Sequence, residues 1–181
     1  TTSKRQPGQA AANNPAKMPL ASDALPVLLS AVKAIEKHFA QANAAGSTKS
    51  VETLGSDQKN KEIAVLVRGQ LCTALSRVLL HGFKSFKLIG RYHIWDFVQQ
   101  SCDATHERRQ ASKQYSAAEL TLTSAVVDVN SHEGMANNPN IKFRSFVCCG
   151  LNHGLLHEWV RVLTEDEETM NTFYEAWAFV R

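Results

Sequence analysis

The chain has 181 residues and a mass of 20.0 kDa, a length that suits one domain or one domain with a tail. Hydrophobic residues make up 44% and charged residues 20% of it, so the composition predicts a packed core and excludes a wholly disordered chain. The net charge of +3 and the pI near 8.7 are too mild for a dedicated nucleic-acid binder. The sequence contains no run of 18 apolar residues, so direct insertion into a membrane is not expected.

The first 21 residues are predicted to be a disordered tail, because Pro7, Gly8, Pro15 and Pro19 lie there among small and polar side chains. After Pro26 the sequence has no proline until Pro139, and such a stretch favours helices. The expected domain therefore covers residues 22–181.

A first helix is expected to begin near Ser22 and Asp23 and to end before Gly46. Its apolar stripe is Leu28, Val32, Ile35 and Phe39.

The second helix is the most regular, and we expect it to begin near Asp57. Its end is expected at Gly82, since glycine tolerates the left-handed conformation that often closes a helix. Its wide apolar stripe comprises Ile63, Val67, Leu71, Leu75, Val78 and Leu79.

A third helix is expected around Ile94–Val98, and the charged residues 103–115 are expected to be irregular. Ser116 and Glu119 match a capping box, so a helix is predicted to follow them. The β-branched residues within 126–129 leave a short strand open as the alternative, although helix is favoured.

A fifth helix is expected from about Asn140 to Leu163, with Gly150 and Gly154 permitting close packing on one face. The run 164–167 (TEDE) matches a second capping box, with Thr164 as the cap. Met170, Phe173, Tyr174 and Trp177 then form the predicted core face of the last helix, and the three tryptophans are all expected in the core. These elements together predict an all-α helical bundle of about six to eight helices.

No catalytic motif stands out. His153 and His157 have the i, i+4 spacing of a zinc pair, but a glycine occupies the position of the glutamate that a zincin needs and no third ligand is evident. Cys148 and Cys149 lack a CxxC spacing; we expect one to pack in the core and the other to face outwards. Phosphate-binding glycine loops and a nucleophile elbow are absent from the sequence. The prediction is a protein without catalysis or cofactor, with a Cys148 or histidine enzyme as the remote alternative.

Charge is distributed unevenly along the chain. Residues 61–115 carry 9 basic and 4 acidic side chains, whereas residues 116–181 carry 4 basic and 9 acidic ones. Such asymmetry usually reflects solvated faces, but it can also steer a charged partner to one side. The basic segment from Lys84 to Arg91, which includes Phe86, could contact RNA, but no RNA-binding signature accompanies it.

The four cysteines have no spacing typical of a disulfide framework, and a reducing, cytoplasmic compartment is therefore expected.

Three sequence blocks, taken in order, resemble the RUN domain family. They are residues 71–84 (LCTALSRVLLHGFK), residues 94–97 (IWDF), and residues 143–152 (FRSFVCCGLN) with their continuation to 173–178 (FYEAWA). The resemblance implies an all-helical module of a cytosolic adaptor that binds small GTPases of the Rab, Rap and Arl groups, or motor and cytoskeletal proteins, without catalysis. Recruitment to an organelle membrane would then occur through the partner.

The resemblance also bears on single residues. In several members the third block reads Arg-Ala-Trp-Leu-Arg, and its basic residues engage an Arl GTPase; here Arg144 matches the first arginine and Phe146 the tryptophan. Cys148 stands where the second arginine would be, which weakens the case for an Arl partner. RUN domains usually continue beyond the Tyr-Glu-x-Trp block, so a domain that lacks its last helix is left open.

We therefore predict a basic partner-binding face composed of Lys84, Lys87, Arg91 and Arg144, in which charge speeds encounter and exposed aromatic residues supply affinity. The alternative is a structural module through which a larger adaptor self-associates or packs intramolecularly. The sequence leaves the oligomeric state and the particular GTPase open.

Overall fold

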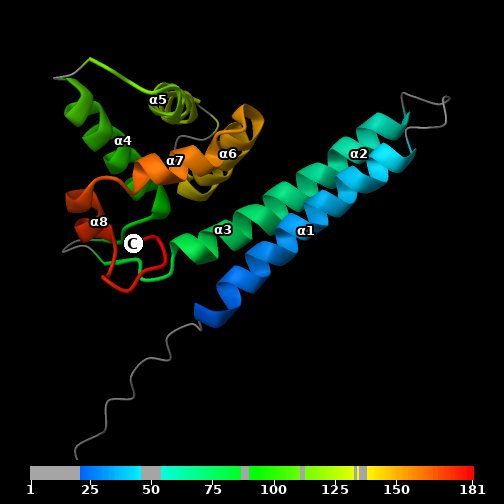
Figure 1. Cartoon of the computed structure of the whole chain (residues 1–181), viewed down its shortest axis with the longest axis horizontal. Helices are drawn as coiled ribbons and strands as arrows, with labels where there is room; N and C mark the ends of the chain where they lie inside the picture. The colour runs from blue at the N-terminus through cyan, green and yellow to red at the C-terminus, as the bar shows by residue number, and fades with distance from the viewer. Residues whose placement is uncertain (1–20, 46–53, 87–89, 111–112, 133, 135–137) are drawn as a thin grey trace, which may run out of the picture.

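The computed structural model describes residues 21–45, 54–86, 90–110, 113–132, 134 and 138–181, and it is built from helices (Figure 1). In chain order they are α1 (Ala21–Ala45), α2 (Leu54–Val65), the π-helical segment η1 (Leu66–Leu71), α3 (Cys72–Leu79), α4 (Ile94–Gln110), α5 (Ala117–Ser131), α6 (Pro139–His153), α7 (Leu156–Leu163) and α8 (Glu167–Phe173). In this part of the chain β pairing is limited to two isolated bridges, Phe83 with Tyr174 and Phe86 with Arg91. The predicted all-α helical bundle is confirmed.

The expected tail lies almost entirely in residues 1–20, outside the described residues, while α1 begins at Ala21, close to the predicted start. None of the described helices combines the length and hydropathy needed to cross a bilayer.

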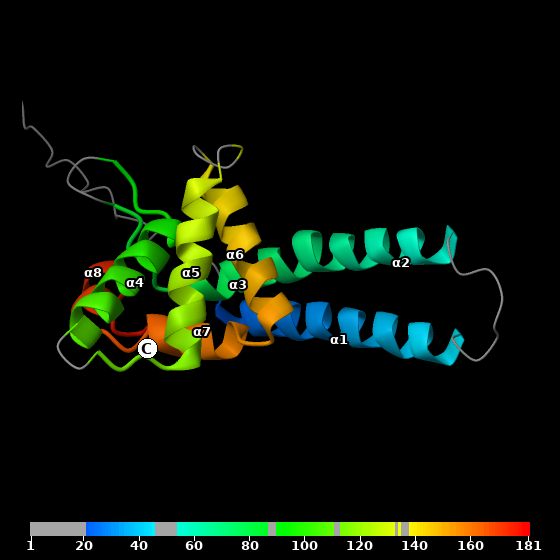
Figure 2. The same cartoon turned by 90° about the horizontal axis from the view of Figure 1, so that it is seen from above.

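A long antiparallel hairpin forms the N-terminal part of the fold. Helix α1 runs beside the continuous helix of α2, η1 and α3, and the far end of this pair projects from the rest of the molecule (Figures 1 and 2). The buried contact between the two arms is made by Ala31, Leu71 and Ala74. Because these alanines are small, they allow the two helices to approach closely. Val32 and Phe39 of the predicted stripe are exposed.

The second arm differs from the uninterrupted α-helix that the sequence predicts. It begins at Leu54 rather than Asp57, and η1 widens it in the middle. The Thr73 hydroxyl, in the first turn of α3, donates a 2.7 Å hydrogen bond back to the Gly69 carbonyl in η1. A wide turn of this kind changes the direction in which the side chains after it point, and hydrophobic periodicity does not reveal it.

The remaining helices pack around an aromatic core. Trp159, Tyr174 and Phe173 are fully buried, and Phe97 and Phe146 are nearly so. Helix α4 continues through Gln110, so the expectation of an irregular segment from residue 103 is wrong for its first half. Its buried face there is Ser101, Cys102 and Thr105, which leaves most of the charged residues on the solvent side.

Two predicted helix boundaries around α5 and α6 have different outcomes. The capping box of Ser116 and Glu119 is present, and residues 126–129 are helical. The long fifth helix is wrong, because Gly154 adopts a left-handed φ of 67° and ends α6, after which α7 begins at Leu156. Gly150 does allow close packing: a Cβ there would lie 2.9 Å from Leu156 Cδ1. At Gly154 a Cβ would meet open space, so its role is conformational and not steric.

The last helix is capped by Asp166, whose carboxylate accepts a 2.8 Å hydrogen bond from the Thr169 N–H; Thr164 is instead the C-cap of α7. Helix α8 ends at Phe173, so Trp177 leaves the predicted core face and is 52% exposed. Trp95 and Trp159 are buried as expected.

Candidate functional site

Three of the four predicted partner-binding residues come before α4, and the structure describes two of them, Lys84 and Arg91. Lys84 is half-buried and tied to α8: its N–H donates to the Phe173 carbonyl at 2.7 Å and its ammonium donates to the Asn171 carbonyl at 2.8 Å. A cation at the carbonyl end of a helix is stabilising, so Lys84 has a structural task. Arg91 is exposed, and its guanidinium lies 5.3 Å from the ring centroid of Phe86, which is 75% exposed. Lys87 lies outside the described residues.

Arg144 lies on the exposed side of α6, where its Nε donates a 3.3 Å hydrogen bond to the carbonyl of Asn140. The side chain of Asn140 in turn lies 3.0 Å from Nε2 of His93, two residues after Arg91. The segment of Arg91 therefore meets the N-terminal turn of α6, one turn before Arg144. Lys84 is anchored separately, on α8.

Arg68 is the residue that sequence reasoning missed. It is an exposed side chain of η1, and it lines a surface cavity of about 510 Å³ together with Arg144. The other residues lining this cavity are Ile141, Ser145, Cys148 and Cys149. In the sequence, only the general excess of basic residues in 61–115 could have indicated Arg68 as a candidate site residue. Its position opposite α6 depends on how the hairpin packs against the other helices, which the sequence pattern does not reveal.

A second cavity of about 440 Å³ continues from Arg68 and Cys148 along the hairpin. Its walls are mainly apolar: Ile35, Phe39, Ile63, Ala64, Val67 and Leu151, with Asn152 beside them. We call the residues lining the two cavities the Arg68–Arg144 surface. It combines two cations with apolar side chains, of which Phe39 is 53% exposed.

Thiols lie at the junction of the two cavities. Cys148 lines both of them, and hydrogen bonds from Cys72 and Arg68 lower the pKa of its thiol to about 6, against the opposing effect of burial. Cys148 and Cys149 are both half-buried, but Cys149 packs against the main core while Cys148 does not, which agrees in part with the expectation that one packs in the core and the other faces outwards.

His153 and His157 fall on different helices, on either side of the turn at Gly154. Across the described ranges no cluster of three or more His, Cys, Asp or Glu side chains could hold a metal ion.

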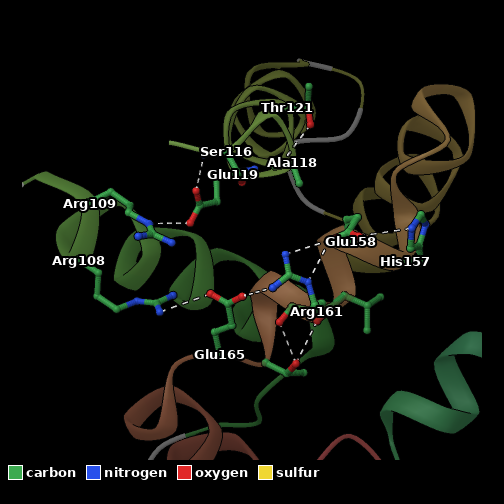
Figure 3. Close-up of polar contacts among 12 residues, drawn as sticks. Arg108, Arg109, Ser116, Ala118, Glu119, Thr121, His157, Glu158, Arg161 and Glu165 are labelled. Atoms are coloured by element: carbon green, nitrogen blue, oxygen red, sulfur yellow. Dashed lines mark hydrogen bonds and ion pairs between the residues drawn. The ribbon is translucent and has the colours of Figure 1, made fainter. Parts of the chain in front are cut away.

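Three other arginines, Arg108, Arg109 and Arg161, are paired with carboxylates (Figure 3). Arg109 binds the buried Glu119 at 2.8 Å, and Arg161 binds Glu158 at 2.9 Å and Glu165 at 2.7 Å. Neither Arg68 nor Arg144 has a carboxylate partner among the described residues. Because a guanidinium gains most from a carboxylate or phosphate, both of these cations are available to a partner's acidic groups.

The Glu119 pair leads to a prediction about pH. Burial opposes ionisation of Glu119, but hydrogen bonds from the Ser116 N–H and from Arg109 outweigh it and lower the pKa of the carboxyl group. A carboxyl group whose pKa is lower in the folded chain than in the unfolded chain stabilises the fold at pH values above its unfolded-state pKa. That stabilisation is lost as the pH falls through the folded-state pKa. In urea unfolding, the stability advantage of wild type over Glu119→Gln should therefore shrink from about pH 6 to about pH 3.

The exposed Glu107→Gln variant controls for the loss of one negative charge. A wild-type advantage over Glu119→Gln that does not change across this range would contradict the assigned role of the ionised Glu119.

Comparisons with known proteins agree with the resemblance seen in the sequence. The family model described as RUN domain matches residues 70–181. The chain is 33% identical over 152 residues to Small G protein signaling modulator 3 of Bos taurus, 32% over 153 residues to that of Homo sapiens, and 30% over 152 residues to the Xenopus laevis homolog. Each match covers 74% of this chain and 20% of the relative, so the chain spans about one fifth of the length of these relatives.

Proposed function

This chain belongs to the RUN domain family, and from that membership we propose that it is a non-enzymatic module that binds a small GTPase through the Arg68–Arg144 surface. The partner class is a GTPase of the Rab, Rap or Arl type, or else a motor or cytoskeletal protein. The module acts in the cytoplasm, and its partner brings it to an organelle membrane.

One observation carries the proposal: two arginines from different elements, η1 and α6, line one cavity with no carboxylate to pair with among the described residues. Charges at an interface speed the encounter of the two proteins, and apolar groups that become buried supply most of the affinity. The adjoining cavity provides apolar groups, Phe39 among them. The names of the relatives, which refer to small G protein signaling, support the partner class.

The test is a binding titration of the chain against a panel of Rab, Rap and Arl proteins loaded with GTP or GDP. Binding that favours the GTP form is expected. Arg68→Glu and Arg144→Glu should each slow association about tenfold at low salt, because charges at the edge of an interface act mainly on the association rate. Surface biosensor kinetics at several salt concentrations measure this effect.

Arg77→Glu is the matched control, since Arg77 is also an exposed arginine of the same continuous helix but lines neither cavity. If both cavity variants bound a GTPase at the wild-type rate, the Arg68–Arg144 surface would not be the binding site. Lys84→Glu and Arg91→Glu test the two described residues of the predicted basic face in the same assay.

A second function is favoured by a different feature, the outer side of α1. Leu25, Leu29 and Val32 lie there at helical spacing, each between 37% and 55% exposed. A module that self-associates could bury this stripe against a second copy. A concentration-dependent dimer in sedimentation, abolished by Leu29→Glu and accompanied by no GTPase binding, would favour this second function; a monomer that binds GTP-loaded GTPase favours the first.

A further inference from the structure

A largely enclosed cavity lies where the hairpin packs against the rest of the molecule. The hairpin has its own small core around Ala31, Leu71 and Ala74, separate from the aromatic core, and Leu75 packs against both. Leu75 also lines the cavity, so the cavity lies at the seam between the two cores. Its volume is about 220 Å³, and none of its lining residues belongs to the Arg68–Arg144 surface.

The wall of this seam cavity is apolar throughout. It is formed by residues of α1, α3, α4, α6 and α7 and of the C-terminal segment, and every lining residue except Thr164 is a leucine, valine or phenylalanine. The Thr164 hydroxyl is already used, because it donates hydrogen bonds to the carbonyls of Val160 at 3.2 Å and Arg161 at 2.9 Å. The side chains of the wall therefore offer a ligand apolar contacts and no free hydrogen-bonding group.

The two ends of the seam cavity differ in burial. Phe97 and Val147 are 1% exposed and Phe146 is 2% exposed, so these residues form the deep end. Leu28 of α1 and Val180 of the C-terminal segment are only half-buried. The cavity thus comes closest to solvent between α1 and the C-terminal segment, and a ligand enters there past aliphatic side chains.

Water is a poor occupant of such a space. A buried water molecule needs two to four polar partners, and cavities without them stay dry. The side chains around an empty cavity also lose the dispersion contacts that a neighbouring atom would give. An engineered cavity of about 150 Å³ with a wall of leucine, isoleucine and phenylalanine takes up benzene or xenon. The seam cavity is larger than that and has the same kind of wall.

We propose that the seam cavity is a binding site for an uncharged hydrocarbon group, aliphatic or aromatic, of at least the size of benzene. A charged or hydrogen-bonding group is excluded from its interior, because such a group would lose its water without gaining a partner. The hydrocarbon group belongs either to a free apolar molecule or to the tail of an amphiphile whose head remains in water at the rim. This inference concerns the seam cavity alone and does not depend on the identity of any protein partner.

The first test is a titration of the folded wild-type chain with benzene, followed by nuclear magnetic resonance. Nuclear Overhauser effects should connect the benzene protons with the methyl groups of Val98 and Val147, which line the cavity. Benzene at ten times the measured dissociation constant should raise the melting temperature by about 4 °C. Phenol, which adds one hydroxyl to the same ring, should bind about tenfold more weakly, since that hydroxyl finds no partner.

Val160→Phe fills the cavity from α7 and should abolish both the Overhauser contacts and the rise in melting temperature. Val127→Phe is the matched control, because Val127 lies on α5, is 59% exposed and does not line the cavity. It should bind benzene as the wild type does. Absence of benzene contacts in the wild type, or equal benzene binding by Val160→Phe, would overturn the assignment. If Val160→Phe fails to fold, the contacts mapped in the wild type and the comparison with phenol decide the point.

The second test separates the two sources of the hydrocarbon group by adding octanoate to the complex with benzene. Displacement of benzene by octanoate would identify the tail of an amphiphile as an acceptable ligand, with its carboxylate outside the rim. Benzene binding that octanoate does not affect would identify a free apolar molecule as the ligand.

Discussion

Replacing Gly82 with alanine is expected to lower the free energy of unfolding by about 3 kcal/mol, through left-handed strain and overpacking together. Gly82 has a φ of 69°, and a Cβ there would lie 2.6 Å from the Cβ and 2.8 Å from the Cα of Ala178. The backbone cannot move away easily, because the Glu175 N–H donates a 2.8 Å hydrogen bond to the Gly82 carbonyl. Guanidinium unfolding followed by circular dichroism measures the loss.

Gly154→Ala is the control for this prediction, since Gly154 has nearly the same φ of 67° but a Cβ added to it would have no neighbour within 4 Å. It should show only the left-handed penalty of about 1 kcal/mol. Equal losses in the two variants would mean that the approach of Ala178 to Gly82 contributes nothing to stability.

Trp159→Ala is expected to cost about 4 kcal/mol, the range for removing a buried large aromatic side chain. Trp159 is fully buried, its ring lies 5.2 Å from that of Phe146, and its indole N–H donates a 3.1 Å hydrogen bond to the Thr121 hydroxyl. The variant therefore leaves a cavity between α5, α6 and α7, while the Thr121 hydroxyl keeps its 2.8 Å hydrogen bond to the Ala117 carbonyl. The same unfolding experiment measures the change.

Trp177→Ala deletes the same side chain at a position that is 52% exposed, where its main ring contact is His81 at 5.0 Å. Its cost should stay near or below about 1 kcal/mol, as at most surface positions. If Trp177→Ala destabilised the chain as much as Trp159→Ala, the placement of the C-terminal segment would be wrong.

These two tryptophans illustrate what the sequence could predict. Each belongs to an apolar stripe at helical spacing, and the stripes predicted the all-α bundle and the burial of Trp159. Whether the helix continues along a stripe, however, depends on contacts with distant parts of the chain. Helix α8 ends at Phe173, because Tyr174 forms a β-bridge with Phe83 and the next residue, Glu175, donates its N–H to the Gly82 carbonyl. Hydrophobic periodicity contains no information about such a pairing.

The capping boxes show the same limit at short range. Ser116 and Glu119 satisfy each other within one helical turn, so the motif was sufficient to place the start of α5. At residues 164–167 several side chains could serve as the cap; Thr164 closes the C-terminal end of α7, and Asp166 caps α8. Local chemistry predicted that a helix begins here, but packing determines which residue caps it.

The candidate site was the least predictable part. The family resemblance pointed to Arg144, while the importance of Arg68 arises only when η1 docks against α6. The ammonium group of Lys84, chosen for its charge, is engaged by the end of α8. Its role as a partner contact stays a prediction, as do those of Lys87, Arg91 and Arg144.

The projecting hairpin has a consequence for how the fold opens. Near the base, α1 and α3 share buried residues such as Ala31 and Ala74, whereas in α2 no side chain that the structure describes is buried. Local opening requires little free energy where few apolar contacts are lost, and it approaches the global value where the core is dense. Amide protons of the hairpin should thus exchange along a gradient, fastest at its far end and slowest at its base. One pair of helices thereby joins a loosely held tip to a base that unfolds only with the whole domain.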